Sequence, residues 1–365
     1  MIVNYLIKRV KVSQIKHSMN QFDFSHKCPL ESWRGQPVPF SENETPLDLM
    51  TLNYPEGFVE LFNLKPEEAI ASAKKGQTAL DNSFYLGPYL FHCPGLSPVA
   101  ISNFIFQNMA QSRSLLFYYF SSINLDYMSI VDACRFLFSR VAFSDNTDRL
   151  MVIFESFASA YILANPYINL SSEDLIRIGM AAVLASGFRT NKSAMPDEEF
   201  LSILENVKLQ TSCKLKIIKS INQEPIPLFF SFTHFSQDPD YTKNGNLKKI
   251  GGMFKTKKDR YFLIEGYILK YYNDHSKKEQ IGELDIEGTV SSYLPADKKE
   301  GERLVIKRKD GGAIGYKISK GVRKKSNHTE YIAYGNDTYD LLCWINTLNL
   351  VAFWKTLKNL ACKKN

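Results

Sequence analysis

The chain has 365 residues, of which 44% are hydrophobic and 23% are charged, and its net charge at pH 7 is +7. This length suits two or three domains, and this composition is sufficient for folded cores. No run of about 18 apolar residues occurs, so we expect no membrane-spanning segment. The apolar stretch within the first eight residues is too short for a signal peptide, which predicts a cytoplasmic protein.

Positive charge is concentrated in the C-terminal third. Residues 241–365 contain 25 Lys and Arg against 14 Asp and Glu, a net of +11, so the rest of the chain carries −4. This asymmetry predicts an anionic partner for the C-terminal part, such as a phosphoinositide headgroup, an acidic membrane surface or nucleic acid. Because no recognised nucleic-acid-binding module underlies the basic residues, we expect no nucleic-acid partner.

The sequence offers no pattern for a metal or a cofactor. Its six cysteines and six histidines lack metal-ligand spacing, and it has no phosphate-binding glycine-rich loop or hydrolase nucleophile elbow. We therefore predict no metal site, no cofactor, and no chemistry in which bonds are made or broken.

Residues 1–54 are expected to form a partly irregular N-terminal arm, since Pro, Ser, Glu and Asn gather between residues 28 and 53. From residue 55 to residue 224 apolar residues recur at helical spacing, which predicts an all-helical domain with short connections. We expect helices over residues 57–64, 66–75, 78–91, 97–107, 111–122, 127–140, 149–163, 172–188, 197–208 and 212–222.

Two of these helices flank a short polar turn, residues 144–147, with the sequence Ser-Asp-Asn-Thr. We expect Asn146 or Asp148 to cap the second helix, and Asn165 followed by Pro166 to end it. A polar turn held between two buried helices is a rigid device for presenting side chains.

The pattern changes near residue 225. Residues 225–241 are expected to form a linker, residues 242–358 a second domain, and residues 359–365 a basic tail that is either inhibitory or merely solubilising. Alternating stretches in the second domain predict seven strands, closed by a helix from residue 338 to about 360 with Trp344 in the core. We expect the strands at residues 245–250, 258–264, 267–272, 280–286, 304–308, 313–318 and 329–334.

This order of elements resembles the cytohesin-type Arf activators, in which a Sec7 exchange domain precedes a pleckstrin-homology (PH) domain. The resemblance spans about residues 55–357. It implies a multidomain fold, in which an all-α right-handed superhelix is followed by a PH-type barrel or sandwich with a C-terminal helix. It also implies a regulator of an Arf-type small GTPase in vesicle trafficking, peripherally attached to phosphoinositide-containing membranes. The supporting motifs are residues 62–66 (Phe-Asn-Leu-Lys-Pro), 95–101 (Gly-Leu-Ser-Pro-Val-Ala-Ile), the ungapped stretch 131–191 and the PH opening 244–252.

The exchange loop of this family carries Pro-Gly-Glu-Ala, and its Glu enters the nucleotide site of the GTPase. There a full negative charge opposes the β-phosphate and competes at the magnesium position. In this chain the finger position is occupied by Asn146, which is neutral and shorter. Asp145 is a possible substitute if the loop shifts its register. The resemblance therefore implies an exchange domain with weak activity, changed specificity or none.

A second family signature, Asn-Thr-Asp-Leu-His-Asn, helps to form the groove that holds the GTPase switch regions. The matching positions here are residues 186–191, and only Asn191 is kept. The resemblance implies GTPase contacts by Ser186, Phe188, Asn191 and, earlier on the same predicted helix, Met180.

In the PH domain the resemblance implies a phosphoinositide site, in which Lys and Arg donate charge-assisted hydrogen bonds to phosphates. Ile281 stands where the family has a third-strand Arg, which predicts reduced affinity or an altered isomer preference. Without the resemblance, the basic run at residues 255–260 would be interpreted as a solvated strand pair. The matching positions are Lys249, Lys255, Lys258, Arg260, Tyr271, Lys317, Asn327 and His328.

Two hypotheses about function remain open. The first is a working exchange factor with a divergent finger. The second is an exchange-inactive binding or scaffold protein that uses the same fold for membrane and protein interaction.

Overall fold

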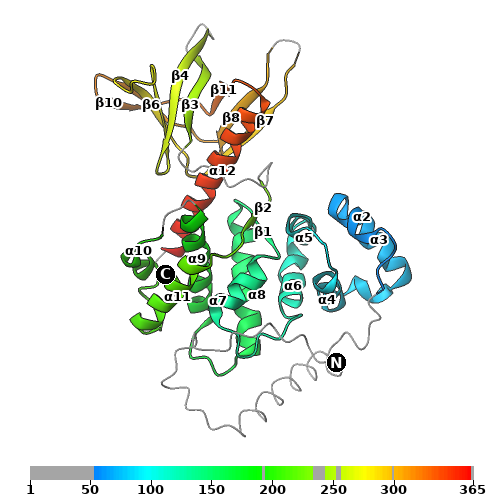
Figure 1. Ribbon diagram of the computed structural model, residues 1–365. Helices are drawn as coiled ribbons and strands as arrows, with labels where there is room; N and C mark the ends of the chain where they lie inside the picture. The colour runs from blue at the N-terminus through cyan, green and yellow to red at the C-terminus, as the bar shows by residue number, and fades with distance from the viewer. Residues whose placement is uncertain (1–52, 191–193, 233–242, 252–255, 298–299, 363–365) are drawn as a thin grey trace. The chain divides into compact units, whose positions relative to one another are not determined.

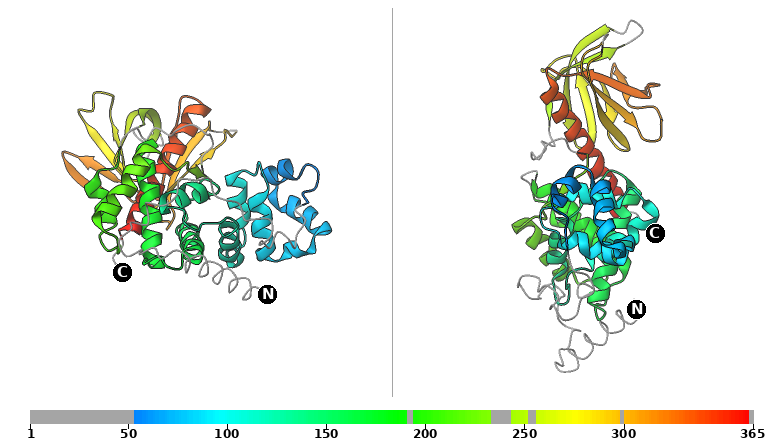
Figure 2. Two further views of the ribbon diagram at one scale, coloured as in Figure 1. Left: turned by 60° about the horizontal axis from the view of Figure 1, so that its bottom comes forward. Right: turned by 90° about the vertical axis from the view of Figure 1, so that its right-hand side faces the viewer.

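The computed structural model describes residues 53–190, 194–232, 243–251, 256–297 and 300–362 (Figures 1 and 2). The chain divides into two compact units, the first ending at Ser231 and the second beginning at Phe232. Across the described ranges, each helix is too short or too polar to cross a membrane. Residues 1–52 of the expected N-terminal arm lie outside these ranges.

The first unit is helical, as predicted, and α6 packs against α4 and α8 (Figure 1). The expected segment 78–91 is divided into a short 3-10 turn and a helix, because Asn82 breaks the helical path and caps the helix that follows. The elements are Phe58–Leu64 (α2), Pro66–Gly76 (α3), Thr78–Asp81 (η2), Ser83–His92 (α4), Pro98–Ile105 (α5), Met109–Phe120 (α6), Ile130–Phe138 (α7), Thr147–Ala164 (α8), Ser172–Thr190 (α9), Asp197–Ile203 (α10) and Thr211–Gln223 (α11).

Aromatic packing joins α7 to α8 on either side of the polar turn. The ring of Phe138 lies 5.7 Å from Phe143, 5.5 Å from Phe154 and 5.1 Å from Phe157, and all four side chains are fully buried. Edge-to-face pairs of this kind add stability beyond the area that they bury. The polar turn is therefore held by an aromatic core.

A short parallel strand pair interrupts the helices. Residues Ala142–Phe143 (β1) pair with Phe229–Phe230 (β2), so part of the segment expected to be a linker packs with the first unit. Neither strand is predictable from the sequence, because two residues are too few to show a strand periodicity.

The second unit is an antiparallel sheet followed by one helix, Thr338–Ala361 (α12). In the described ranges the hydrogen-bonded order is β10-β9-β6-β5-β4-β3-β11-β8-β7. The prediction of a seven-strand barrel or sandwich with a C-terminal helix is confirmed in part. The described sheet has nine strands, and it is not a closed barrel because β10 and β7 lie at opposite ends of this order. The strands are Asn244–Gly251 (β3), Thr256–Glu265 (β4), Ile268–Tyr272 (β5), Gln280–Asp285 (β6), Thr289–Leu294 (β7), Arg303–Arg308 (β8), Tyr316–Ser319 (β9), Val322–Lys325 (β10) and Glu330–Tyr334 (β11).

Helix α12 packs on β7 and β8 and completes the core of this unit. Trp344 is fully buried with its ring 6.3 Å from that of Phe262, which confirms that it belongs to the core. The amide of Asn349 also bonds the backbone of Ser291 on β7, accepting from its N–H at 2.8 Å and donating to its carbonyl at 3.0 Å. The β7 end of the sheet is thus fastened to the helix.

Candidate functional site

Asn146, in the loop predicted to be the exchange loop, caps α8. Its side-chain oxygen accepts a hydrogen bond from the backbone N–H of Arg149 at 3.1 Å, and its backbone has the extended conformation of an N-cap. Asparagine is among the preferred residues here, because its side chain satisfies one of the unpaired N–H groups of the first turn. Of the two caps expected from the sequence, Asn146 is the one used, and its acceptor oxygen is already engaged.

The start of the loop is fixed through β1. The N–H of Ala142 donates to Ser102 Oγ at 2.7 Å, and the carbonyl of Phe143 accepts from the N–H of Ser231 at 2.9 Å. Ser144 is buried, and the loop becomes exposed at Asn146. The loop is therefore a short exposed element held by β1 on one side and by α8 on the other.

The charges around this loop are mixed. Asp145 is half-buried, whereas Asp148 is exposed in the first turn of α8, where a carboxylate interacts favourably with the helix dipole. The guanidinium of Arg149 lies over the ring of Phe106 at 5.6 Å. The loop thus presents the neutral amide of Asn146 at the predicted finger position, with one carboxylate immediately before it and one two residues after it.

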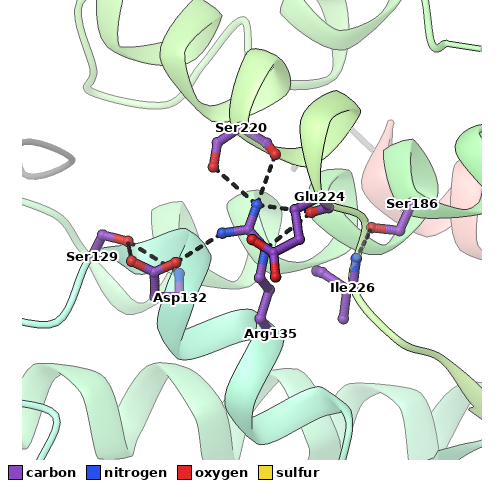
Figure 3. A network of polar contacts seen from close by, with 7 residues as sticks. All are labelled: Ser129, Asp132, Arg135, Ser186, Ser220, Glu224 and Ile226. Carbon is purple, nitrogen blue, oxygen red and sulfur yellow. Dashed lines mark hydrogen bonds and ion pairs between the residues drawn. The ribbon is translucent and has the colours of Figure 1, made fainter. Parts of the chain in front are cut away.

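The predicted GTPase contacts on α9 differ in exposure. Ser186 is fully buried; its hydroxyl donates to the carbonyl of Ala182 at 2.9 Å and accepts from the N–H of Ile226 at 3.1 Å. That hydroxyl therefore joins α9 to the segment leading to β2 (Figure 3). Phe188 is half-buried and Met180 is buried, while Asn191 lies outside the described residues.

Arg135 on α7 binds the C-terminal end of α11 (Figure 3). Its Nη2 donates to the carbonyls of Ser220 at 2.7 Å and Glu224 at 2.8 Å, and its Nη1 donates to Asp132 Oδ1 at 2.8 Å. Asp132 is held in turn by the Ser129 hydroxyl at 2.6 Å. A cation here binds carbonyls at the end of the helix: the Ser220 carbonyl, which also accepts from the N–H of Glu224 at 3.0 Å, and the carbonyl of the C-cap residue Glu224 itself.

In the second unit, the predicted lipid-binding residues of the first strands share one face of the sheet. Lys249 is paired with Lys258 across β3 and β4, and Arg260 is two residues beyond Lys258. Tyr271 on β5 is paired with Phe262, two residues beyond Arg260. Because directly opposed residues share a face and side chains alternate along a strand, these four predicted residues point to the same side.

A shallow pocket brings together four of the predicted residues, Lys249, Tyr271, Lys317 and His328. Asn327 is exposed and does not line it, and Lys255 lies outside the described residues. Several other lining residues were not predicted from the sequence, because their positions depend on strand register and on the loop before β11. These are Glu283, Tyr316, Ser326 and Tyr331.

Lys249 lies between two tyrosines. Its Nζ donates to the Tyr271 hydroxyl at 3.0 Å and lies 4.3 Å and 4.5 Å from the ring centres of Tyr271 and Tyr331. Burial, followed by the charges of Lys317 and Arg260, lowers the pKa of Lys249 to about 8, and burial raises the pKa of Tyr271 to about 12. The pocket thus holds a cation that an anionic ligand would stabilise.

Tyr331 places a second polar group in this pocket. Its hydroxyl is buried and has no hydrogen-bond partner within the described part of the chain. A buried hydroxyl is normally paired, so this one is available to a ligand or a water molecule. Ile281, which was predicted to replace a third-strand Arg, packs against the hydrophobic core.

The first unit is similar to a known domain family. Residues 54–226 match the family model of the Sec7 domain. Cytohesin-4 of Mus musculus is 23% identical over 252 residues, and the match covers 65% of this chain but only 63% of that relative. The Sec7p catalytic domain aligns with 48% of this chain and 99% of its own at 18% identity and a TM-score of 0.44. The ORP8 PH domain aligns with 30% of this chain and 93% of its own at 16% identity and a TM-score of 0.27. Residues 54–226 are therefore similar to the Sec7 domain family, and a longer stretch of the chain is similar to the cytohesins at low identity.

Proposed function

We propose that this chain regulates an Arf-type small GTPase at phosphoinositide-containing membranes. The observation that carries the proposal is the Sec7 match over residues 54–226, within which β1 and α8 hold an exposed loop where the family has its exchange finger. In this proposal the loop, Phe188 on α9 and the predicted contact Asn191 meet the GTPase. Ser186 has a positioning role, because its hydroxyl is already used by Ala182 and Ile226.

The capped Asn146 argues against exchange by a glutamate finger. Its amide carries no charge to oppose a phosphate, and its oxygen is bound to the helix that it caps. Any exchange activity then depends on Asp145, or on a shift of the loop that places a different residue at the finger position. The alternative function is an exchange-inactive protein that binds the GTPase and the membrane on the same fold.

GDP release from a panel of magnesium-loaded Arf-type GTPases on phosphoinositide vesicles tests the first function. The informative variant is Asn146→Asp, because aspartate keeps the capping oxygen and adds the missing charge. Asn146→Glu restores the longer family side chain but loses the preferred cap, and Asp145→Ala removes the possible substitute. The four proteins are compared at equal vesicle occupancy.

The outcomes separate the hypotheses. Exchange by the unmodified chain that is lost in Asp145→Ala supports a working factor with a displaced finger. If the unmodified chain does not release GDP but Asn146→Asp or Asn146→Glu does, the docking surface for the GTPase is intact and catalysis is absent. This outcome supports the scaffold alternative. If no protein acts on any member of the panel and none binds it, the GTPase part of the proposal fails.

The membrane part of the proposal assigns the basic face of β3, β4 and β5 to phosphates. Lys249, Lys258, Arg260 and Lys317 would donate to the phosphates, and Tyr271 and His328 would contact the headgroup. Asn327 and Lys255 remain predicted contacts. Glu283 in the pocket wall and Ile281 in place of an Arg favour reduced affinity or an altered isomer preference.

Charge reversal at Lys258 and Arg260 to Glu is expected to abolish binding to phosphoinositide vesicles. The matched control is Lys216→Glu with Lys219→Glu on α11, which makes the same change of charge in the other unit. Equal binding by the two double variants would remove the lipid site from this face.

A further inference from the structure

The hairpin formed by β9 and β10 is strongly basic. Residues 316–325 contain five Lys and Arg and no Asp or Glu. The turn between the strands is Lys320-Gly321, with φ of +51° and +75°, the two positive values that a tight two-residue hairpin turn requires. Because β10 lies at the end of the strand order, this charge stands at an outer edge of the sheet.

Strand pairing aligns residues of this hairpin with residues that line the candidate headgroup pocket. Lys324 is paired with Lys317, Lys317 with Gly282, and Gly282 with Tyr271. Directly opposed residues share a face, so these positions form one row across four strands. Lys324 therefore extends the row of the pocket by one strand toward the outer edge.

The opposed lysines lack an internal counter-charge. Across the ranges that the structure describes, neither Lys317 nor Lys324 forms an ion pair, although like charges directly opposite one another destabilise a sheet. On the other face of the same strand, Arg323 is paired with Glu283 at 2.6 Å and stacks on Tyr316 at 3.5 Å. The pocket-lining carboxylate of Glu283 is thus neutralised by Arg323, whereas the row of Lys317 and Lys324 keeps an uncompensated positive charge.

An apolar side chain stands on this same face beside the turn. Val322, two residues before Lys324 and opposite Ser319, is 67% exposed. An exposed aliphatic group next to lysines suits the boundary of an anionic bilayer, where the side chain enters the interface and the charges meet headgroups.

We propose that Val322 and Lys324 form a second contact with an anionic lipid bilayer, beside the headgroup pocket. The proposal rests on the proposed function for its membrane setting, but it predicts binding to phosphatidylserine that needs no phosphoinositide. The competing explanation is that the lysines only prevent edge-to-edge pairing of β10, since edge strands commonly carry lysine for that purpose.

The test uses the full chain and vesicles of phosphatidylcholine with phosphatidylserine. Lys324→Gln is compared with Lys325→Gln, which removes the same charge from the opposite face of the same strand. One lysine near an anionic surface contributes about fivefold in affinity, so Lys324→Gln should weaken binding by about that factor and Lys325→Gln by less than about twofold. Val322→Asn should also weaken vesicle binding. Lys324→Gln, Lys325→Gln and Val322→Asn should all bind soluble inositol hexakisphosphate within about twofold of the unmodified chain.

Three results would overturn the proposal. The first is that the unmodified chain does not bind phosphatidylserine vesicles at low salt. The second is that Lys324→Gln and Lys325→Gln lose equal vesicle affinity. The third is that Lys324→Gln binds vesicles as well as the unmodified chain but self-associates in sedimentation. The last result would assign Lys324 to edge protection. Failure of the headgroup pocket would be seen separately. The chain would still bind phosphatidylserine vesicles, but phosphoinositide would not strengthen that binding and inositol hexakisphosphate would not compete with it.

Discussion

The carbonyl oxygen of Glu224 lies 2.8 Å from Nη2 and 3.0 Å from Nε of Arg135, so a cation on α7 holds the end of α11. The carboxylate of Glu224 is 4.0 Å from the same guanidinium and is mostly exposed, so it adds little. The backbone of this residue, and not its charge, is therefore the important partner.

Replacing this cation should destabilise the first unit. Arg135→Leu removes the donors to the Ser220 and Glu224 carbonyls, and we expect a loss of about 2–3 kcal/mol in the free energy of unfolding. Denaturant unfolding of the full chain, followed by a probe in the first unit, measures it. Arg113→Leu, which removes an exposed guanidinium paired with Glu155, should cost less than about 1 kcal/mol. Equal losses in the two variants would contradict the assignment.

The cap at Asn146 makes a second prediction. Asn146→Ala should cost about 1 kcal/mol and speed hydrogen exchange at the N–H of Arg149, whereas Asn146→Asp should leave both nearly unchanged. Amide exchange of the first turn of α8 is the measurement. If Asn146→Asp behaved like Asn146→Ala, the side-chain oxygen would not be the cap.

The pKa of Lys249 predicts how headgroup binding depends on pH. Burial and the neighbouring Lys317 and Arg260 lower this pKa from 10.5 to about 8, and a bound phosphate would raise it again because it stabilises the ammonium. Affinity for a soluble inositol phosphate should be level below about pH 8 and then fall by up to about tenfold per pH unit. Titration calorimetry at several pH values measures the slope, which Lys249→Gln should abolish; an equal slope in that variant would contradict the prediction.

The lowered pKa of Lys249 makes folding stability change with pH in the opposite direction to headgroup affinity. The unfolded chain keeps the Lys249 proton up to its ordinary pKa of 10.5, whereas the folded chain releases it from about pH 8. The unfolded state therefore binds more protons in this window, so the contribution of Lys249 to stability rises with pH between about 8 and 10.5.

Gly282 should be needed for the position of Tyr271. A Cβ at Gly282 would lie 2.5 Å from Tyr271 Cζ and 2.5 Å from the Tyr316 carbonyl oxygen, so one of them must move. Gly282→Ala should cost about 1–3 kcal/mol and weaken inositol phosphate binding, because Tyr271 also contacts Lys249. Gly301→Ala, where a Cβ meets no atom within 4 Å, is the matched control. Similar stability of the two variants would show that the sheet adapts without cost.

Sequence periodicity predicted the helices of the first unit well, because each buries a stripe of apolar residues. It failed at β10, whose four residues are all exposed, so that no alternation marks the strand. It also failed at β7, Thr289–Leu294, where buried Ser291 alternates with exposed Val290 and reverses the usual polarity signal. A strand that lies at the edge of a sheet, or whose inner face is covered by a helix, cannot be predicted from hydrophobic alternation alone.

The candidate site was predictable only in part. Charge and resemblance indicated Lys249, Tyr271, Lys317 and His328, which the structure brings into one pocket. The buried hydroxyl of Tyr331 and the capping role of Asn146 depend on the local partners of each side chain. Ser186 was misjudged as a surface contact for the same reason, since a serine bonded within its own helix is compatible with full burial.

The pairing of β2 with β1 sets the shortest piece of this chain that is expected to fold as the complete first unit. A fragment ending at residue 224 would lack the Ile226 N–H that bonds Ser186, and it would remove the Ser231 N–H from the Phe143 carbonyl beside the loop at residues 144–147. A purified first unit should therefore extend to Ser231, since a shorter fragment would be assayed with this loop unsupported.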